Sequence, residues 1–135
     1  MMKSSSETQD FAFVSIAIIT LISLVGKPPT HKESKTATGL ILATTDLLLN
    51  YDFVMGVKNY IEKKMKDDFL HFPSKVFEEI GKVKLRPDQA ALAIDLGVKY
   101  LLKNETITHD KIAIIEEASE RIGMQFKRPL SFWLK

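Results

Sequence analysis

Cysteine is absent from this chain of 135 residues. Its absence excludes disulfides, thiol catalysis and cysteine-ligated zinc, and it fits a reducing compartment, so we expect a cytoplasmic protein. The sequence also has no Gly-rich phosphate loop, Gly-x-Ser-x-Gly elbow, His-Glu-x-x-His pair or dinucleotide fingerprint. Because no nucleophile, base or cofactor clamp is visible, we expect a protein that is not an enzyme and needs no cofactor.

An excess of charge of one sign is missing as well. The chain has 19 Lys and Arg against 17 Asp and Glu, a formal net charge of +2. Its densest basic stretch, within residues 63–68, ends in two aspartates, which is typical of a solvated helix face. The adjacent glutamates Glu78-Glu79 and Glu116-Glu117 are expected to be solvated too. Without a basic patch, we expect no nucleic-acid partner.

The longest apolar feature is the uncharged run from Phe11 to Gly26. A membrane-spanning helix needs about 20 apolar residues, and this run is a little shorter. It also follows acidic residues and precedes Lys27-Pro28-Pro29, unlike a secretory signal. The run therefore predicts a central core helix and no membrane contact. A membrane anchor formed by residues 11–25 is the alternative.

Apolar residues recur at helical spacing along the rest of the chain, and no sustained period-two alternation occurs. These patterns predict an all-α fold, a single compact domain over residues 1–135 with six to seven helices. We expect a first hairpin over 8–49, middle helices over 52–82, a second hairpin over 87–123 and a tail over 124–135.

Local signals place several helix ends. Thr30 offers an N-cap for a helix over 31–49, with Glu33 as its capping-box partner. Asp52 and Thr108 are predicted to cap later helices, and Gly123 to end the last one. Gly39, in the middle of the second helix, indicates a close approach or a weak point.

The two hairpins are similar to each other. Shifting the sequence by 78 positions pairs Ile16 with Ile94 and Leu24 with Leu102, and it pairs Thr30-His31 with Thr108-His109. Each half is then a buried apolar helix, a polar break, a Thr-His start and an amphipathic helix. This order predicts a duplication in which the two apolar helices pack back to back.

With this layout, the region from Gln9 to Met124 resembles the TerB-like family, helical domains named for tellurite resistance. The closest stretch is LAIDLGVKYLLKNETITHDKIAIIEEASERIGM, residues 92–124. It resembles the family's second repeat, an alanine-rich helix, an Asp-Gly acidic loop and a helix closed by a Leu-Gly pair. In this chain the closing pair is Ile122-Gly123.

The resemblance implies a compact multi-helix bundle with acidic loop residues that are associated with divalent cations such as calcium. Glu33 and Asp110 match acidic family positions, and Glu105 lies in the second loop. The chain departs from the pattern where Gly26-Lys27 and Asn104-Glu105 replace the two Asp-Gly pairs. Lys32 and Lys111 likewise stand where carboxylates are usual, whereas a hard cation needs several converging oxygen ligands.

We therefore expect a non-catalytic helical binding or scaffold module of TerB-like type, which acts through protein partners in stress resistance, against tellurite or phage. A homodimer is left open. The alternative within the family is a divalent-metal-responsive domain that uses Glu33, Glu105 and Asp110 together with the histidines; His31 and His109 could also form a pair.

The tail MQFKRPLSFWLK combines basic and aromatic residues, including the single tryptophan. Phe132 and Trp133 are its candidate partner-binding residues. The alternative is a strap that covers an exposed end of the core.

Overall fold

The structure, a computed structural model, describes residues 6–25, 29–104 and 107–124. Within these residues the all-α prediction is confirmed, since seven helices and no strand are present. The helices are α1 (Ser6–Leu24), α2 (His31–Ala43), α3 (Thr45–Leu49), α4 (Tyr51–Asp67), α5 (Phe72–Lys82), α6 (Pro87–Leu102) and α7 (His109–Arg121).

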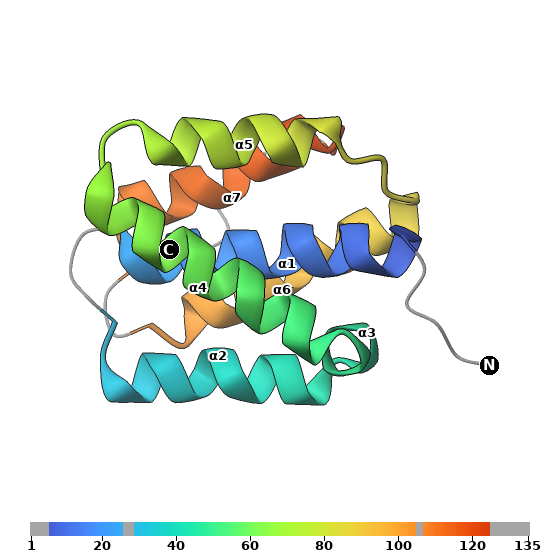
Figure 1. The fold of residues 1–135 in the computed structure, drawn as a ribbon, viewed down its shortest axis with the longest axis horizontal. Helices are drawn as coiled ribbons and strands as arrows, with labels where there is room; N and C mark the ends of the chain where they lie inside the picture. The colour runs from blue at the N-terminus through green and yellow to red at the C-terminus, as the bar shows by residue number, and fades with distance from the viewer. Residues whose placement is uncertain (1–5, 26–28, 105–106, 125–135) are drawn as a thin grey trace.

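Helix α1 lies at the centre of the bundle (Figure 1). It packs mainly against α4 and α6, while α2 lies to one side and α5 and α7 lie to the other. From Phe11 to Ile22 every side chain except Phe13 is at most 2% exposed. The core-helix interpretation of this run is confirmed. None of the helices in the described ranges has the length and hydropathy needed to cross a membrane.

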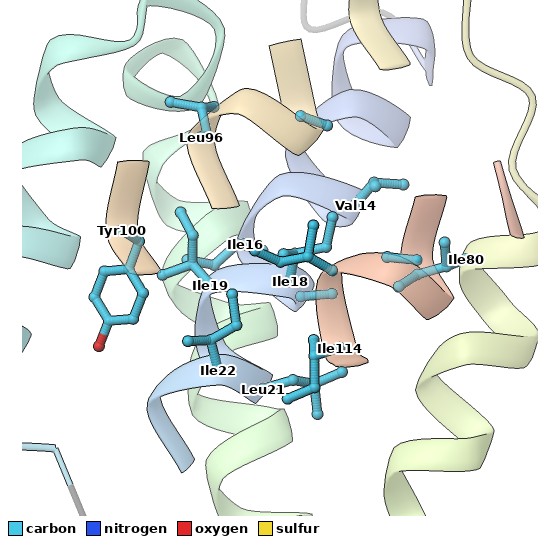
Figure 2. Packing of buried hydrophobic residues seen from close by; sticks show 14 of the residues in the cluster. Val14, Ile16, Ile18, Ile19, Leu21, Ile22, Ile80, Leu96, Tyr100 and Ile114 are labelled. Carbon is cyan, nitrogen blue, oxygen red and sulfur yellow. The ribbon is translucent and has the colours of Figure 1, made fainter. Parts of the chain in front are cut away.

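The branched side chains of α1 form the middle of the hydrophobic core. Figure 2 shows Ile16, Ile18 and Ile22 there, with Tyr100 of α6 on one side and Ile80 of α5 on the other. Full burial of one such side chain contributes about 1.5–3 kcal/mol. Because apolar residues lie all round α1, contact along one face would leave many of them in water. The helix is therefore stable only when other helices surround it.

The predicted duplication is visible in the helix boundaries. A shift of 78 residues carries α2 from His31–Ala43 onto α7 at His109–Arg121, and it carries the end of α1 at Leu24 onto the end of α6 at Leu102. The two central helices pack together, α2 packs on α6, and α7 packs on α1. The C-terminal ends of α1 and α6 and the N-terminal ends of α2 and α7 all lie at the same end of the bundle (Figure 1).

The predicted caps of these hairpins are present. The Glu33 amide donates to Thr30 Oγ1 over 3.1 Å, and the Thr30 amide donates to Glu33 Oε1 over 3.0 Å, which completes the capping box. Thr108 Oγ1 accepts from the Lys111 amide. Gly123 has a φ of +82°, and the Met124 amide donates to the Ser119 carbonyl, as in a Schellman end.

The prediction of one continuous helix over 31–49 was wrong. The helix is interrupted at Thr44, which separates α2 from α3. The backbone there is extended, with φ −106° and ψ +114°, and Thr44 Oγ1 donates to the Leu40 carbonyl over 2.8 Å. The break starts α3 in a new direction and buries Leu47, whereas Leu48 is 47% exposed. Local hydrogen bonding by the threonine competes with the helix.

The predicted cap at Asp52 was also wrong. Asp52 lies inside the first turn of α4, and Asn50 occupies the N-cap position without a side-chain cap. The Asn50 side chain donates instead to the carbonyl of Asp46, in the first turn of α3. The side-chain amide of Asn50 therefore stabilises the α3–α4 turn. Asp52 contributes only through its negative charge near the positive N-terminal end of the α4 dipole.

The close helix approach occurs at Gly97 rather than Gly39. Nothing lies within 4 Å of a β-carbon built on Gly39, whereas one built on Gly97 would lie 2.7 Å from Ile18 Cγ2. Gly97 thus sets the distance between α1 and α6.

Candidate functional site

An apolar groove of about 640 Å³ opens between α4 and α5 over the N-terminal half of α1. Phe13 of α1 contributes to it, and it is the one side chain between Phe11 and Ile22 that is not fully buried. The α4 and α5 walls are mainly apolar and aromatic. They include Phe53, Val57, Tyr60, Phe72 and Val76.

The α4 wall is a second apolar stripe beside the buried one. Val54, Ile61 and Met65 enter the core, whereas Phe53, Val57 and Tyr60 follow each other at spacings of four and three on the neighbouring face. Phe53 is 37% exposed and Tyr60 is 56% exposed. The second stripe was not recognised in the sequence, although its spacing was available as a signal.

Gly56 keeps this wall open. It lines the groove in the interior of α4, and nothing lies within 4 Å of a β-carbon built there. A β-carbon would meet no neighbour there, so close packing does not require glycine at this position. Its effect is to leave the space between Phe53 and Tyr60 unfilled.

Two aromatic rings connect the groove walls. Tyr60 of α4 and Phe72 of α5 meet edge to face, with ring centroids 5.9 Å apart. On the other side of Tyr60, Lys64 Nζ lies 5.7 Å from the ring centroid. Phe69 and Leu70, in the turn between the two helices, are 49% and 80% exposed. The apolar surface thus continues beyond the groove itself.

The α5 rim of the groove carries charges of both signs, Lys75, Glu78 and Glu79. Glu79 pairs with Lys82 over 3.1 Å, while Glu78 has no ion-pair partner among the described residues. Glu78 also lines a shallower polar hollow between α5 and α7, together with Glu117 and Glu120. In that hollow Glu117 pairs with Arg121 over 2.7 Å. An occupant that carries positive charge would therefore meet uncompensated carboxylates here.

A separate polar cluster lies at the loop end of the bundle. Glu33 and Lys111 are the two charged side chains that are buried within the described ranges, at 6% and 8% exposure. They occupy equivalent positions of the repeat, since residue 33 shifted by 78 is residue 111. The duplication has therefore placed one buried charge of each sign at the third position of α2 and of α7.

Asn104, just beyond the end of α6, connects Lys111 to that helix. Lys111 Nζ donates to Asn104 Oδ1, and Asn104 Nδ2 donates to the Tyr100 carbonyl over 2.8 Å. Burial of the Tyr100 hydroxyl, reinforced by the nearby Glu33 charge, raises the pKa of Tyr100 to about 12. Ser23 and Asn104 lie beside that hydroxyl, but none of the described groups gives it a hydrogen bond of good geometry. Figure 2 shows the ring extending away from the core cluster.

The predicted metal ligands are not equivalent in the structure. Glu33 is buried and occupied by its capping box, whereas Asp110 is exposed in the first turn of α7. Glu105 lies outside the described residues. Over the described ranges, no three His, Asp or Glu side chains form a group that could hold a metal ion. His31 and His109 are exposed at the first positions of α2 and α7.

The remaining candidates, Phe132 and Trp133, also lie outside the described residues. What the described arrangement offers is therefore an apolar groove with a charged rim, and a polar cluster at the loop end of the bundle. The groove can accept apolar side chains from another segment. In the cluster, Lys111 and Asn104 are hydrogen-bonded within the second hairpin, which is typical of a support for the fold.

In comparisons with known proteins, no family model, no curated protein and no solved structure matches the chain. The TerB-like resemblance therefore stays a prediction from the sequence.

Proposed function

We propose that this protein is a non-catalytic helical binding or scaffold module, and that the groove between α4 and α5 is its binding surface. The observation that carries the proposal is the second apolar stripe of α4, whose aromatic residues Phe53 and Tyr60 are exposed although a buried stripe already fixes the helix in the core. Exposed aromatic side chains are typical of interaction surfaces.

The partner that fits best is an amphipathic segment of another protein. Its apolar side chains would lie between Phe53, Tyr60 and Val76, and a lysine or arginine would face Glu78 on the α5 rim. A helix laid into a groove uses anchors three and four residues apart, which matches the spacing of the α4 wall. By its resemblance to TerB-like proteins, the module would act in the cytoplasm in a stress-resistance setting.

Gly56→Lys tests the groove. The substitution places a long, charged side chain in the groove wall, where the β-carbon meets no atom within 4 Å. It should leave folding intact, because lysine favours a helix interior over glycine by about 0.5–1 kcal/mol. An apolar partner segment would then have to bury or displace an ammonium group, which we expect to weaken binding at least tenfold, or about 1.4 kcal/mol.

Gly39→Lys is the matched control. Gly39 is likewise exposed in a helix interior with open space around it, but it lies on α2 and does not line the groove. With the full chain as bait, the wild type and Gly39→Lys should retain the same identified protein, and Gly56→Lys should lose it. Equal retention by all three proteins would contradict the assignment of the groove.

A further inference from the structure

The groove raises the question of what covers it before a partner arrives, and the chain itself supplies a segment of the right chemistry. Residues 125–135 contain five apolar side chains, among them Phe132 and Trp133, and three basic ones, with no acidic residue. The groove offers aromatic walls and the uncompensated carboxylate of Glu78. The apolar side chains of the segment match the aromatic walls, and its basic residues match Glu78, although the rim also carries Lys75.

The segment also starts close to the groove. Helix α7 ends beside the end of α5, because a β-carbon built on Gly81 would lie 3.6 Å from Arg121 Cδ. Met124, the last described residue, donates its amide to the Ser119 carbonyl and packs against the core. The chain therefore leaves α7 next to the hollow that holds Glu117 and Glu120, and this hollow shares Glu78 with the groove.

The length is sufficient in either regular conformation. Helix α5 has 11 residues, a length of about 16 Å at 1.5 Å per residue. The segment from residue 125 to residue 135 also has 11 residues, so it spans about 16 Å as a helix and about 36 Å when extended. A path along α5 from Gly81 to Lys75 needs about 9 Å. Both lengths exceed this path, and Pro129 favours the extended conformation over a continuous helix.

We infer that residues 125–135 fold back into the α4–α5 groove of the same molecule, with Phe132 and Trp133 between the aromatic walls and the basic residues opposite Glu78 and Glu120. The inference rests on the proposed function, because it treats the groove as a binding surface. It adds that the binding surface is covered in the free protein. A partner segment must then displace residues 125–135, so the apparent affinity for the partner is lower than it would be for an uncovered groove.

Trp133 reports on this directly, because it is the only tryptophan in the chain. The measurement uses the full chain: the Trp emission maximum and the Stern–Volmer constant for acrylamide quenching. In the wild type and in Gly39→Lys, we expect blue-shifted emission and quenching several-fold weaker than in the chain unfolded by denaturant. In Gly56→Lys, we expect the emission to shift to the red and quenching to rise toward the unfolded value. Far-UV circular dichroism establishes that both variants are folded.

Three outcomes overturn the inference. One is a Trp133 that is as exposed in the wild type as in the unfolded chain. Another is a Trp133 that stays protected in Gly56→Lys. The third is protection that is lost on dilution, which would mean that the tail of a second copy occupies the groove. Protection that is independent of protein concentration and sensitive to Gly56→Lys supports docking within one molecule.

The two proposals fail in distinguishable ways. If Trp133 is exposed in all variants but Gly56→Lys loses its partner, the tail does not cover the groove and the proposed function stands. If Gly56→Lys releases Trp133 but keeps its partner, the tail docks as inferred and the partner binds elsewhere.

Discussion

Gly97→Ala tests whether the contact between α1 and α6 is as close as the structure describes. A β-carbon at this position would lie 2.7 Å from Ile18 Cγ2 and 3.8 Å from Ile115 Cγ1. The Ile18 methyl group is on a β-branched side chain that is 0% exposed and sits in the centre of the core. It cannot rotate away as the end of a flexible side chain would, so the two helices must separate.

Two effects oppose each other in this variant. Alanine in a helix interior is favoured over glycine by about 0.8–1 kcal/mol. An extra methyl group in a filled core costs about 1–3 kcal/mol, and the short distance to a stiff neighbour puts the cost in the upper part of that range. The net expectation is a loss of about 1–2 kcal/mol in the free energy of unfolding, measured from urea denaturation with an unchanged m value.

Two further variants make the test specific. Gly39→Ala has open space around the new methyl group and should stabilise the protein by about 0.5–1 kcal/mol. Ile18→Leu removes the methyl group that clashes while keeping the side-chain volume, so the double variant Ile18→Leu/Gly97→Ala should be more stable than additivity predicts. The packing argument is refuted if Gly97→Ala is as stabilising as Gly39→Ala, or if the double variant shows no coupling.

The polar cluster at the loop end gives two more predictions. The pKa of Tyr100 is raised to about 12 from 10.0, so the folded state holds this proton more tightly, and the resulting stability is present below pH 10 and lost as the pH rises toward 12. Near neutral pH, the free energy of unfolding of Tyr100→Phe should be close to that of the wild type, because the hydroxyl has no well-formed hydrogen bond. Between pH 10 and pH 12, the variant should lose about 2–3 kcal/mol less of this free energy than the wild type does. Identical pH profiles of the two proteins in urea denaturation would refute this prediction. Lys111→Met should destabilise by about 1–3 kcal/mol, because buried Asn104 Oδ1 loses its donor, whereas Lys103→Met, at an exposed position, should stay within about 0.5 kcal/mol. Equal effects of the two lysine substitutions on thermal unfolding would contradict the role given to Lys111.

The sequence was sufficient for features that depend on neighbours along the chain. The caps at Thr30 and Thr108 and the end at Gly123 were predicted because each is made by residues within a few positions of one another. The burial of α1 was predicted because its apolar residues lie on every face, and no amphipathic packing satisfies such a helix. The repeat followed from the same local patterns occurring twice.

Features that depend on what lies opposite a residue were decided only by the tertiary structure. Gly39 and Gly97 are both glycines inside helices, and only the approach of Ile18 makes one of them a contact point. Lys111 reads as a surface residue in the sequence, yet it is buried because Asn104, seven positions away, accepts from its ammonium group. The groove likewise needs α4, α5 and α1 to be placed side by side. Helical spacing assigns residues to a face, but it does not say whether that face meets another helix or water.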